Sequence, residues 1–366
     1  MRVAIVHDWL VSYRGGEKVL ETIASEFPEA PVYTLFYDPG SLPESLKNRV
    51  VYYPPLLNRL KKIRKILLPF LPACIEAFNL NDYDLIISTS SCVAKGVIPA
   101  PQARHLCYIH SPMRYIWDQK SEYLKQMQGI PFASLLFHLL GSRLRIWDQV
   151  SSHRVDQFIA NSAFVAKRVK KYYGADSQVI HPPVDTEFFH PPENPDSHSR
   201  NYFLAAGALV SYKGFGRVIH ACEQAGQQLI IAGAGPELKR LQKISGKHTQ
   251  FIVSPDNESL RKLFQGAKAL LFPGVEDFGM VAIEAMACGT PVIALRQGGS
   301  LDFIEEGLSG EFVDTTEIPD WVQALRNFGP EKYDASTIRK FSETFHHHIF
   351  IKKFRESVQQ LLSEKV

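Results

Sequence analysis

The chain has 366 residues, which is long for one hydrophobic core, so we expect two domains. Its 41 basic and 38 acidic residues leave a net charge of +3, and this near balance gives no reason to expect nucleic acid as a partner. The five cysteines stand singly, without the paired spacing of a zinc site or a redox couple, and indicate reduced core residues.

The amino terminus predicts a cytoplasmic protein. A buried strand is expected over residues 3–6, directly after Met1, which leaves no room for a signal peptide. No apolar run approaches the roughly 20 residues that a transmembrane helix needs. We therefore expect neither secretion nor a membrane span.

A glycine pair follows this first strand. Gly15 and Gly16 precede a helix that is expected over residues 18–26, which gives a strand, a glycine loop and a helix. A plain tight turn explains such a pair equally well, so the pair alone is a weak signal for ligand binding.

The rest of the first half alternates between strands and helical stretches, with strands expected over residues 32–37, 49–53, 85–88, 103–109 and 158–160. That alternation predicts a doubly wound α/β domain, which binds ligands at the carboxyl ends of its strands. His110 follows one of these strands, and Arg114 and Tyr115 come shortly after it. His110 is either a ligand-binding residue or a histidine held by structural hydrogen bonds.

A basic segment lies between residues 45 and 75, where seven Lys and Arg residues and no acidic residue occur. Leucine and isoleucine recur at helical spacing over residues 56–68, alongside most of the basic side chains. Two interpretations are open. The segment is either a helix that packs its apolar face on the core, or a surface that docks on an anionic membrane.

A proline-rich connector over residues 182–195 marks the domain boundary. We expect a first domain over residues 1–183, a linker over 184–200 and a second domain over 201–344. A long helix is expected over residues 340–364.

The second domain continues the alternation, with strands expected over residues 202–206, 228–232, 251–254, 269–272, 292–295 and 305–314. Gly233 and Gly235 form a Gly-x-Gly turn after one of these strands. Leu238 stands where the third glycine of a dinucleotide fingerprint would be, so we reject NAD as a ligand.

The stretch from Ala269 to Ala294 carries the strongest functional signal, and its helix is expected over residues 281–287. Gly279 lets the backbone approach a ligand where that helix begins, and amides at a helix start bind anions such as phosphate. Glu276 and Glu284 frame the loop, and carboxylates accept protons from hydroxyl groups. Either glutamate alone is more readily explained as solvated or as complementing the helix dipole in the first turn. Together with the glycine loop, they predict a nucleotide sugar.

The pattern Glu-Asp-Phe-Gly-x4-Glu-Ala-Met-Ala-x-Gly-x-Pro-Val in this stretch resembles the signature of the retaining GT-B glycosyltransferases of family 4. The segments that begin at His110, Phe158 and His181 extend the resemblance over nearly the whole chain, which is similar to bacterial O-antigen mannosyltransferases. The resemblance implies two Rossmann-like domains that face a central cleft, with the terminal segment, about residues 345–366, crossing back to the first domain.

The resemblance also implies residue roles. Glu276 and His110 would lie near the donor sugar, and Glu284 would contact the ribose. The donor-binding residues that we expect are Gly15, Gly16, Lys213, Arg217, Phe278, Gly279, Met280, Val281 and Glu284. The acceptor-side residues that we expect are Arg14, Arg114 and Tyr115.

Lys213 supplies a positive charge that suits a diphosphate, although a lysine in a loop is more often solvated surface. Many family members carry an arginine shortly before this lysine, and the mannosyltransferase-like subgroup has a second basic residue after it. This chain has Ala208 in the first region and Gly214 at the second position. Arg217 is the candidate to compensate.

We expect no metal ion and no cofactor. Asp82 and Asp84 have the letters of the Asp-x-Asp motif with which glycosyltransferases of the other major fold bind a metal, but they precede a strand in a polar turn, which is the preferred interpretation. The resemblance implies front-face attack, in which the departing phosphate accepts the proton of the acceptor, so that no protein base is needed.

These features predict a retaining, metal-independent hexosyltransferase with His110, Lys213 and Glu276 as catalytic residues. It would move mannose from GDP-mannose to a glycan or lipid-linked acceptor in cell-surface polysaccharide synthesis, peripherally on the inner face of the plasma membrane. Three alternatives stay open: a UDP-sugar-dependent transferase of the same fold, a nucleotide-sugar epimerase of that fold, and a non-catalytic nucleotide-binding scaffold.

Overall fold

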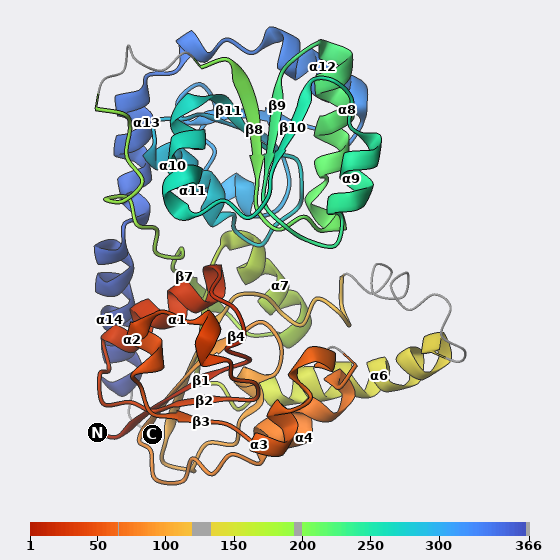
Figure 1. Cartoon of the computed structure of the whole chain (residues 1–366). Coiled ribbons are helices and arrows are strands. Elements are labelled where there is room, and N and C mark those ends of the chain that lie inside the picture. The colour runs from red at the N-terminus through yellow and green to blue at the C-terminus, as the bar shows by residue number, and fades with distance from the viewer. Residues whose placement is uncertain (65, 119–132, 194–199, 364–366) are drawn as a thin grey trace. The chain divides into compact units, whose positions relative to one another are not determined.

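The computed structural model describes residues 1–64, 66–118, 133–193 and 200–363. The chain forms two compact units (Figure 1). The first comprises Met1–His181 with Phe350–Val366, and the second comprises Pro182–Ile349. Sequence predictions that fall on Lys65, on linker residues 194–199 and on residues 364–366 lie outside the described residues.

The first unit is built on a parallel sheet of seven strands. In spatial order these are β3 (Val51–Tyr52), β2 (Val32–Thr34), β1 (Val3–His7), β4 (Leu85–Ser90), β5 (Arg104–Ile109), β6 (Gln157–Ala160) and β7 (Ser177–Val179). The strand order reverses between β1 and β4, so their carboxyl ends form a topological switch point, where open α/β sheets bind ligands. The short edge strand β7 was not among the predicted strands.

Helices cover both faces of this sheet, because alternate residues of a strand point to opposite faces. On one face, Ile5 and Ile87 pack with α1 (Gly15–Ser25) and α14 (His347–Ser363). On the other face, Ala4 and Ile86 pack with α4 (Leu71–Glu76) and α6 (Ala133–Ser152). The other α-helices in the part of this unit that the structure describes are α2 (Glu44–Lys47), α3 (Pro55–Asn58) and α7 (Ala163–Tyr173).

The second unit contains a parallel sheet of six strands. In spatial order these are β10 (Thr249–Ile252), β9 (Leu229–Ala232), β8 (Tyr202–Ala206), β11 (Ala267–Phe272), β12 (Val292–Leu295) and β13 (Gly310–Val313). The helices that pack on one face are α8 (Phe215–Ala225), α9 (Leu238–Ile244) and α12 (Ile318–Asn327). Those on the other face are α10 (Asn257–Gly266), α11 (Met280–Ala287) and α13 (Ala335–Ser342) (Figure 1). The predicted pair of doubly wound, Rossmann-like domains is therefore confirmed.

From Phe350 onward the terminal helix α14 belongs to the first unit, as predicted. Its buried face consists of Phe350, Phe354, Val358 and Leu361. The single long helix predicted over residues 340–364 is wrong, because a 3-10 turn, η9 (Glu343–Phe345), and an extended residue, His346, separate α13 from α14. The main chain is held open there by Val184, whose N–H donates to the carbonyl of Phe345 at 3.0 Å and which forms a parallel bridge with His346.

The basic segment over residues 56–68 is also not one helix. It is divided into α3, η2 (Lys61–Ile63) and the start of η3 (Leu68–Phe70). The side chain of Asn58 bonds to both the N–H and the carbonyl of Tyr37, at 2.9 and 3.1 Å, and so holds the end of α3 against another part of the unit. Such a tertiary contact overrides the helical spacing of the leucines.

Among the helices that the structure describes, none combines the length and the hydropathy that a bilayer-crossing segment needs.

Candidate functional site

In the second unit, Lys213 and Glu276 lie in the loops that follow two adjacent strands. Lys213 ends η6 (Ser211–Lys213) after β8, and Glu276 follows β11. The order of the sheet reverses between these two strands, so both residues lie at its switch point. Lys213 Nζ is 2.9 Å from Glu276 Oε1, and the side chains are only 12% and 17% exposed. The residues predicted for phosphate and for sugar hydroxyls are therefore in contact.

Two glycines let these loops come together. Gly207 has φ +129°, and a Cβ at this position would be 2.9 Å from Lys213 Nζ. A Cβ on Gly274 would be 2.6 Å from the Lys213 Cα. Sequence reasoning did not select either glycine, although each follows closely on a predicted strand. Gly207 and Gly274 position the lysine, because any side chain there would displace it or its backbone.

The main chain of Glu276 is held by a third loop, which follows β12. The N–H of Gly299 donates to the Glu276 carbonyl at 2.8 Å, and a Cβ on Gly298 would be 2.6 Å from that carbonyl oxygen. Sequence reasoning also missed this pair, and its signal was present as two glycines after a buried strand.

The start of α11 lies four residues after Glu276. Gly279 precedes it with φ +119°, and a Cβ there would be 2.6 Å from the Phe272 ring. Met280 and Val281, in the first turn, are half-buried. Phe278 is buried against Phe303, with ring centroids 5.7 Å apart, so its ring is part of the core and only its main chain is available to a ligand. The first N–H groups of a helix have no partner within the helix and bind anions.

Glu284 was predicted in the first turn of α11. This prediction is wrong, because the helix already begins at Met280. Glu284 lies in the second turn and is buried. The alternative that it complements the helix dipole from the first turn is therefore wrong.

Arg217 brings its guanidinium next to position 214. Its Nη1 donates to the carbonyl of Pro273 at 2.5 Å and lies 3.0 Å from the place where a Cβ on Gly214 would be. Gly214 has φ +69°, a conformation that side chains rarely adopt. Arg217 thus supplies a positive charge beside Gly214.

In the first unit, His110 follows β5 and its ring is directed toward the start of α1. The ring atom Nε2 is buried and has no hydrogen-bond partner among the described residues. A Cβ on Gly16 would lie 3.7 Å from this nitrogen, and Gly15 begins α1. The pKa of His110 is lowered to about 3, mainly by burial and also by His7, while Asp8 acts in the opposite direction. The imidazole is therefore neutral near pH 7.

The surroundings of His110 include groups that sequence reasoning did not select. Asn161 Nδ2 donates to the carbonyl of His110 at 3.0 Å, so Asn161 positions this residue. His7 Nδ1 is 2.6 Å from Thr89 Oγ1. Asp8 accepts hydrogen bonds from the N–H groups of Ser91, Val93 and Ala94, which join the ends of β1 and β4.

The residues predicted for the acceptor side are less closely grouped. Arg14 is exposed and precedes α1, where its N–H donates to Glu17 Oε2 at 2.9 Å. Arg114 Nε lies 3.4 Å from Ser111 Oγ, and Tyr115 packs against the core that contains α4 and α6. Asp82 and Asp84 lie in a turn as predicted, and Asp84 Oδ2 accepts the N–H of Arg2 at 2.6 Å.

The chain is similar to known proteins along nearly its whole length. Residues 13–188 match the family described as Glycosyltransferase Family 4, and residues 187–340 match Glycosyl transferases group 1. The D-inositol 3-phosphate glycosyltransferase of Mycobacterium tuberculosis is 30% identical over 203 residues, which are 49% of this chain and 42% of that protein. The chain thus spans less than half the length of the curated relatives that it matches.

Two solved structures show the same fold. Sucrose-phosphate synthase from Thermosynechococcus elongatus has a TM-score of 0.73 and 18% identity, with 99% of this chain and all of that chain covered. Anabaena HepE, solved in complex with UDP, has a TM-score of 0.72 and 16% identity, with 98% and 100% covered. The two family matches show that the chain belongs to the family 4 glycosyltransferases, and the structural similarities show that it has the GT-B fold.

Proposed function

We propose that this chain is a retaining, metal-independent hexosyltransferase that uses a nucleotide diphosphate sugar. The observation that carries the proposal is the contact between Lys213 and Glu276 at the switch point of the second sheet, beside the start of α11. The site thus combines a cation for phosphate, a carboxylate for sugar hydroxyls and helix amides.

The ion pair suggests how donor binding prepares the site. A diphosphate would take the place of Glu276 as the partner of Lys213, because the diphosphate as a whole carries more negative charge than one carboxylate. The carboxylate of Glu276 is then free to accept hydrogen bonds from the sugar. Lys213, with Arg217 and the α11 amides, would stabilise the diphosphate as it departs, which is electrostatic stabilisation of developing charge.

His110 would act through a neutral ring. Its low pKa, which results mainly from burial, leaves it uncharged near pH 7, so it can hydrogen-bond to a sugar hydroxyl without opposing the positive charge that develops on the sugar. The departing phosphate would accept the proton of the acceptor hydroxyl.

A thermal-shift panel of nucleoside diphosphates and nucleotide sugars would identify the base and the sugar of the donor. GDP-mannose follows from the sequence resemblance, whereas HepE has been solved with UDP and with UDP-glucose. We expect a selective rise in melting temperature with GDP and GDP-mannose that a chelator does not abolish, since a ligand of the native state stabilises it. A shift with UDP compounds alone would replace GDP-mannose by a UDP-sugar. A panel without any shift would contradict donor binding.

Exposed residues of the first unit suggest a surface that binds the membrane in which a lipid-linked acceptor would lie. Leu56, Ile66 and Phe70 are 75%, 69% and 66% exposed, and the exposed residues Arg59 and Lys62 stand between Leu56 and Ile66 in the chain. Apolar side chains surrounded by basic ones suit the interface of an anionic membrane. Leu57, Leu67 and Leu68 pack on the core, so the membrane interpretation is proposed for the exposed side chains of the segment alone. We propose that this patch docks the enzyme on the inner face of the plasma membrane.

Removing two charges from this patch is expected to weaken vesicle binding. Each basic residue near an anionic surface contributes about 1 kcal/mol, so Arg59→Gln with Lys62→Gln should lower the partition coefficient about 30-fold. The measurement is cosedimentation with phosphatidylglycerol vesicles. Lys239→Gln with Lys243→Gln, on the exposed side of α9, is the matched control. Equal binding by both double variants would show that this patch is solvated surface only.

A further inference from the structure

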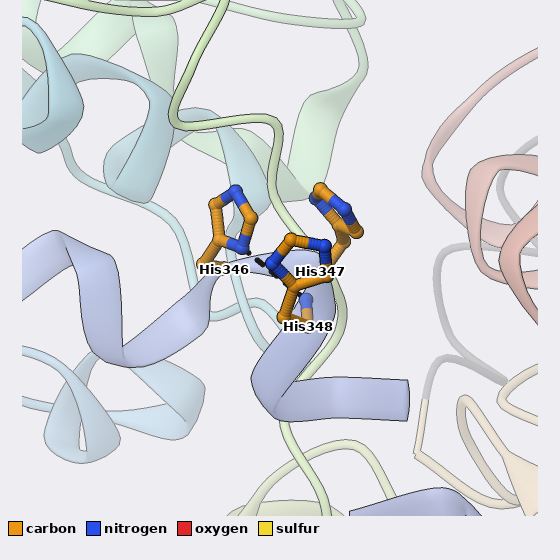
Figure 2. Close-up of side chains that lie close together, drawn as sticks. All are labelled: His346, His347 and His348. Carbon is orange, nitrogen blue, oxygen red and sulfur yellow. Dashed lines mark hydrogen bonds between the residues drawn. The ribbon is translucent and has the colours of Figure 1, made fainter. Parts of the chain in front are cut away.

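Three consecutive histidines lie together where η9 ends and α14 begins. Figure 2 shows the rings of His346, His347 and His348 gathered at this turn of the chain. One ligand atom from each of them lies within 4.8 Å of those of the other two. His346 and His347 are half-buried and His348 is exposed, so the cluster is accessible to ions.

We propose that these three histidines bind one divalent transition metal ion, for which Zn²⁺ is the best chemical match. Imidazole nitrogen is a preferred ligand of zinc, copper and nickel. Tetrahedral Zn–N bonds of 2.0–2.1 Å place ligand atoms about 3.4 Å apart. The separations found here, up to 4.8 Å, would shorten to that value when the rings close on an ion.

The orientation of His346 supports this assignment. Its Nδ1 accepts a hydrogen bond from the main-chain N–H of His348 at 3.2 Å, which Figure 2 marks by a dashed line. That contact leaves Nε2 as its metal-binding atom. Nε2 lies 3.4 Å from Oε1 of Glu187, which is the spacing of two ligands on one tetrahedral ion. We therefore propose Glu187 as the fourth ligand, with its exposed carboxylate turning toward the other two rings when the ion binds.

Some charges around the cluster oppose the binding of a cation and others favour it. The amino end of α14 disfavours a cation, since the helix dipole is positive there. Glu187 and Asp185 offset this effect with two negative charges near His347.

The site has a particular place in the chain. The backbone passes from the first unit to the second after His181 and returns to the first unit after Ile349. Residues 184–187 follow the first of these crossings, residues 346–348 precede the second, and Val184 pairs with His346. A metal ion held by the three histidines and Glu187 would cross-link the two segments. None of these residues belongs to the donor site, so the inference is independent of the proposed function.

The test is calorimetric titration of the untagged full chain with Zn²⁺, supported by the visible spectrum of the Co²⁺ form. We expect one ion per chain and the intense bands of tetrahedral Co²⁺. The triple variant H346Q/H347Q/H348Q should lose both, whereas H153Q/H220Q, which removes two exposed histidines elsewhere, should keep them. If the triple variant does not fold, the single variants Glu187→Gln and His348→Gln decide, and each should weaken binding about 10-fold or more.

Two outcomes would overturn the proposal. One is Zn²⁺ binding by the triple variant, or by both single variants, with the stoichiometry and affinity of the natural chain. The other is absence of Zn²⁺ binding by the natural chain. In either case the cluster is a solvated helix start.

Discussion

Replacing Lys213 with alanine is expected to lower turnover of the nucleotide sugar about 100- to 1,000-fold, because it removes a preorganised cation from the departing diphosphate. Nucleotide affinity should fall as well, since Lys213 also contacts the ground-state phosphates. The measurement is the initial rate of nucleotide release with donor and acceptor, together with the Kd of the nucleoside diphosphate.

Two variants make this result interpretable. Lys262→Ala removes a cation from an exposed ion pair with Glu258 in α10 and should change neither quantity, because such pairs contribute little. Glu276→Gln removes the other half of the buried pair and should lower turnover more than nucleotide affinity, since Glu276 is assigned to the sugar. If turnover of the Lys213 variant equalled that of the natural chain, the assignment of Lys213 to phosphate would be wrong.

The substitution Gly207→Ala is expected to lower turnover about 100-fold without touching a charged residue. The new methyl group would lie 2.9 Å from Lys213 Nζ, and the flexible lysine, not the backbone, would move. A displacement of about 1 Å in a catalytic group can cost this much. Gly207 also has φ +129°, so part of the effect is backbone strain.

A control and a double variant separate these two causes. Gly307 has φ +81° and nothing within 4 Å of a Cβ, so Gly307→Ala adds strain without contact and should leave turnover nearly unchanged. In the Lys213→Ala background, Gly207→Ala should have little further effect on turnover, because the side chain that it displaces is absent. Full additivity of the two substitutions would show that Gly207 acts through the backbone alone.

Much of the fold follows from local patterns. Strands β8 and β12 have the predicted bounds, because each is a short apolar run between turn residues. The patterns failed where tertiary contacts act. Asn58 holds the end of α3 to Tyr37, which divides the segment predicted as a basic helix, and Val184 holds His346 extended between α13 and α14.

The site, like the fold, was predicted in part from the sequence and in part only seen in the structure. Residue types and spacing selected Lys213, Glu276, Gly279 and His110, because their chemistry is recognisable in the chain itself. The spacing carries no information on distances between loops, so it could not show that Lys213 and Glu276 are in contact, or that Gly207 and Gly299 position them. The low pKa of His110 depends on burial, which is also a tertiary property.

The sequence by itself determined the two-domain α/β class, the family and the residues that carry charge and hydroxyl-binding groups, since these depend on composition, periodicity and motif. Only the tertiary structure decided which of those residues meet, which glycines leave room for them, and that Leu56, Ile66 and Phe70 remain exposed. The same holds for Glu187 and the three consecutive histidines, because Glu187 is far from them in the chain and next to His346 in space. The physical reason is that contacts between distant segments arise from packing, which local preferences do not encode.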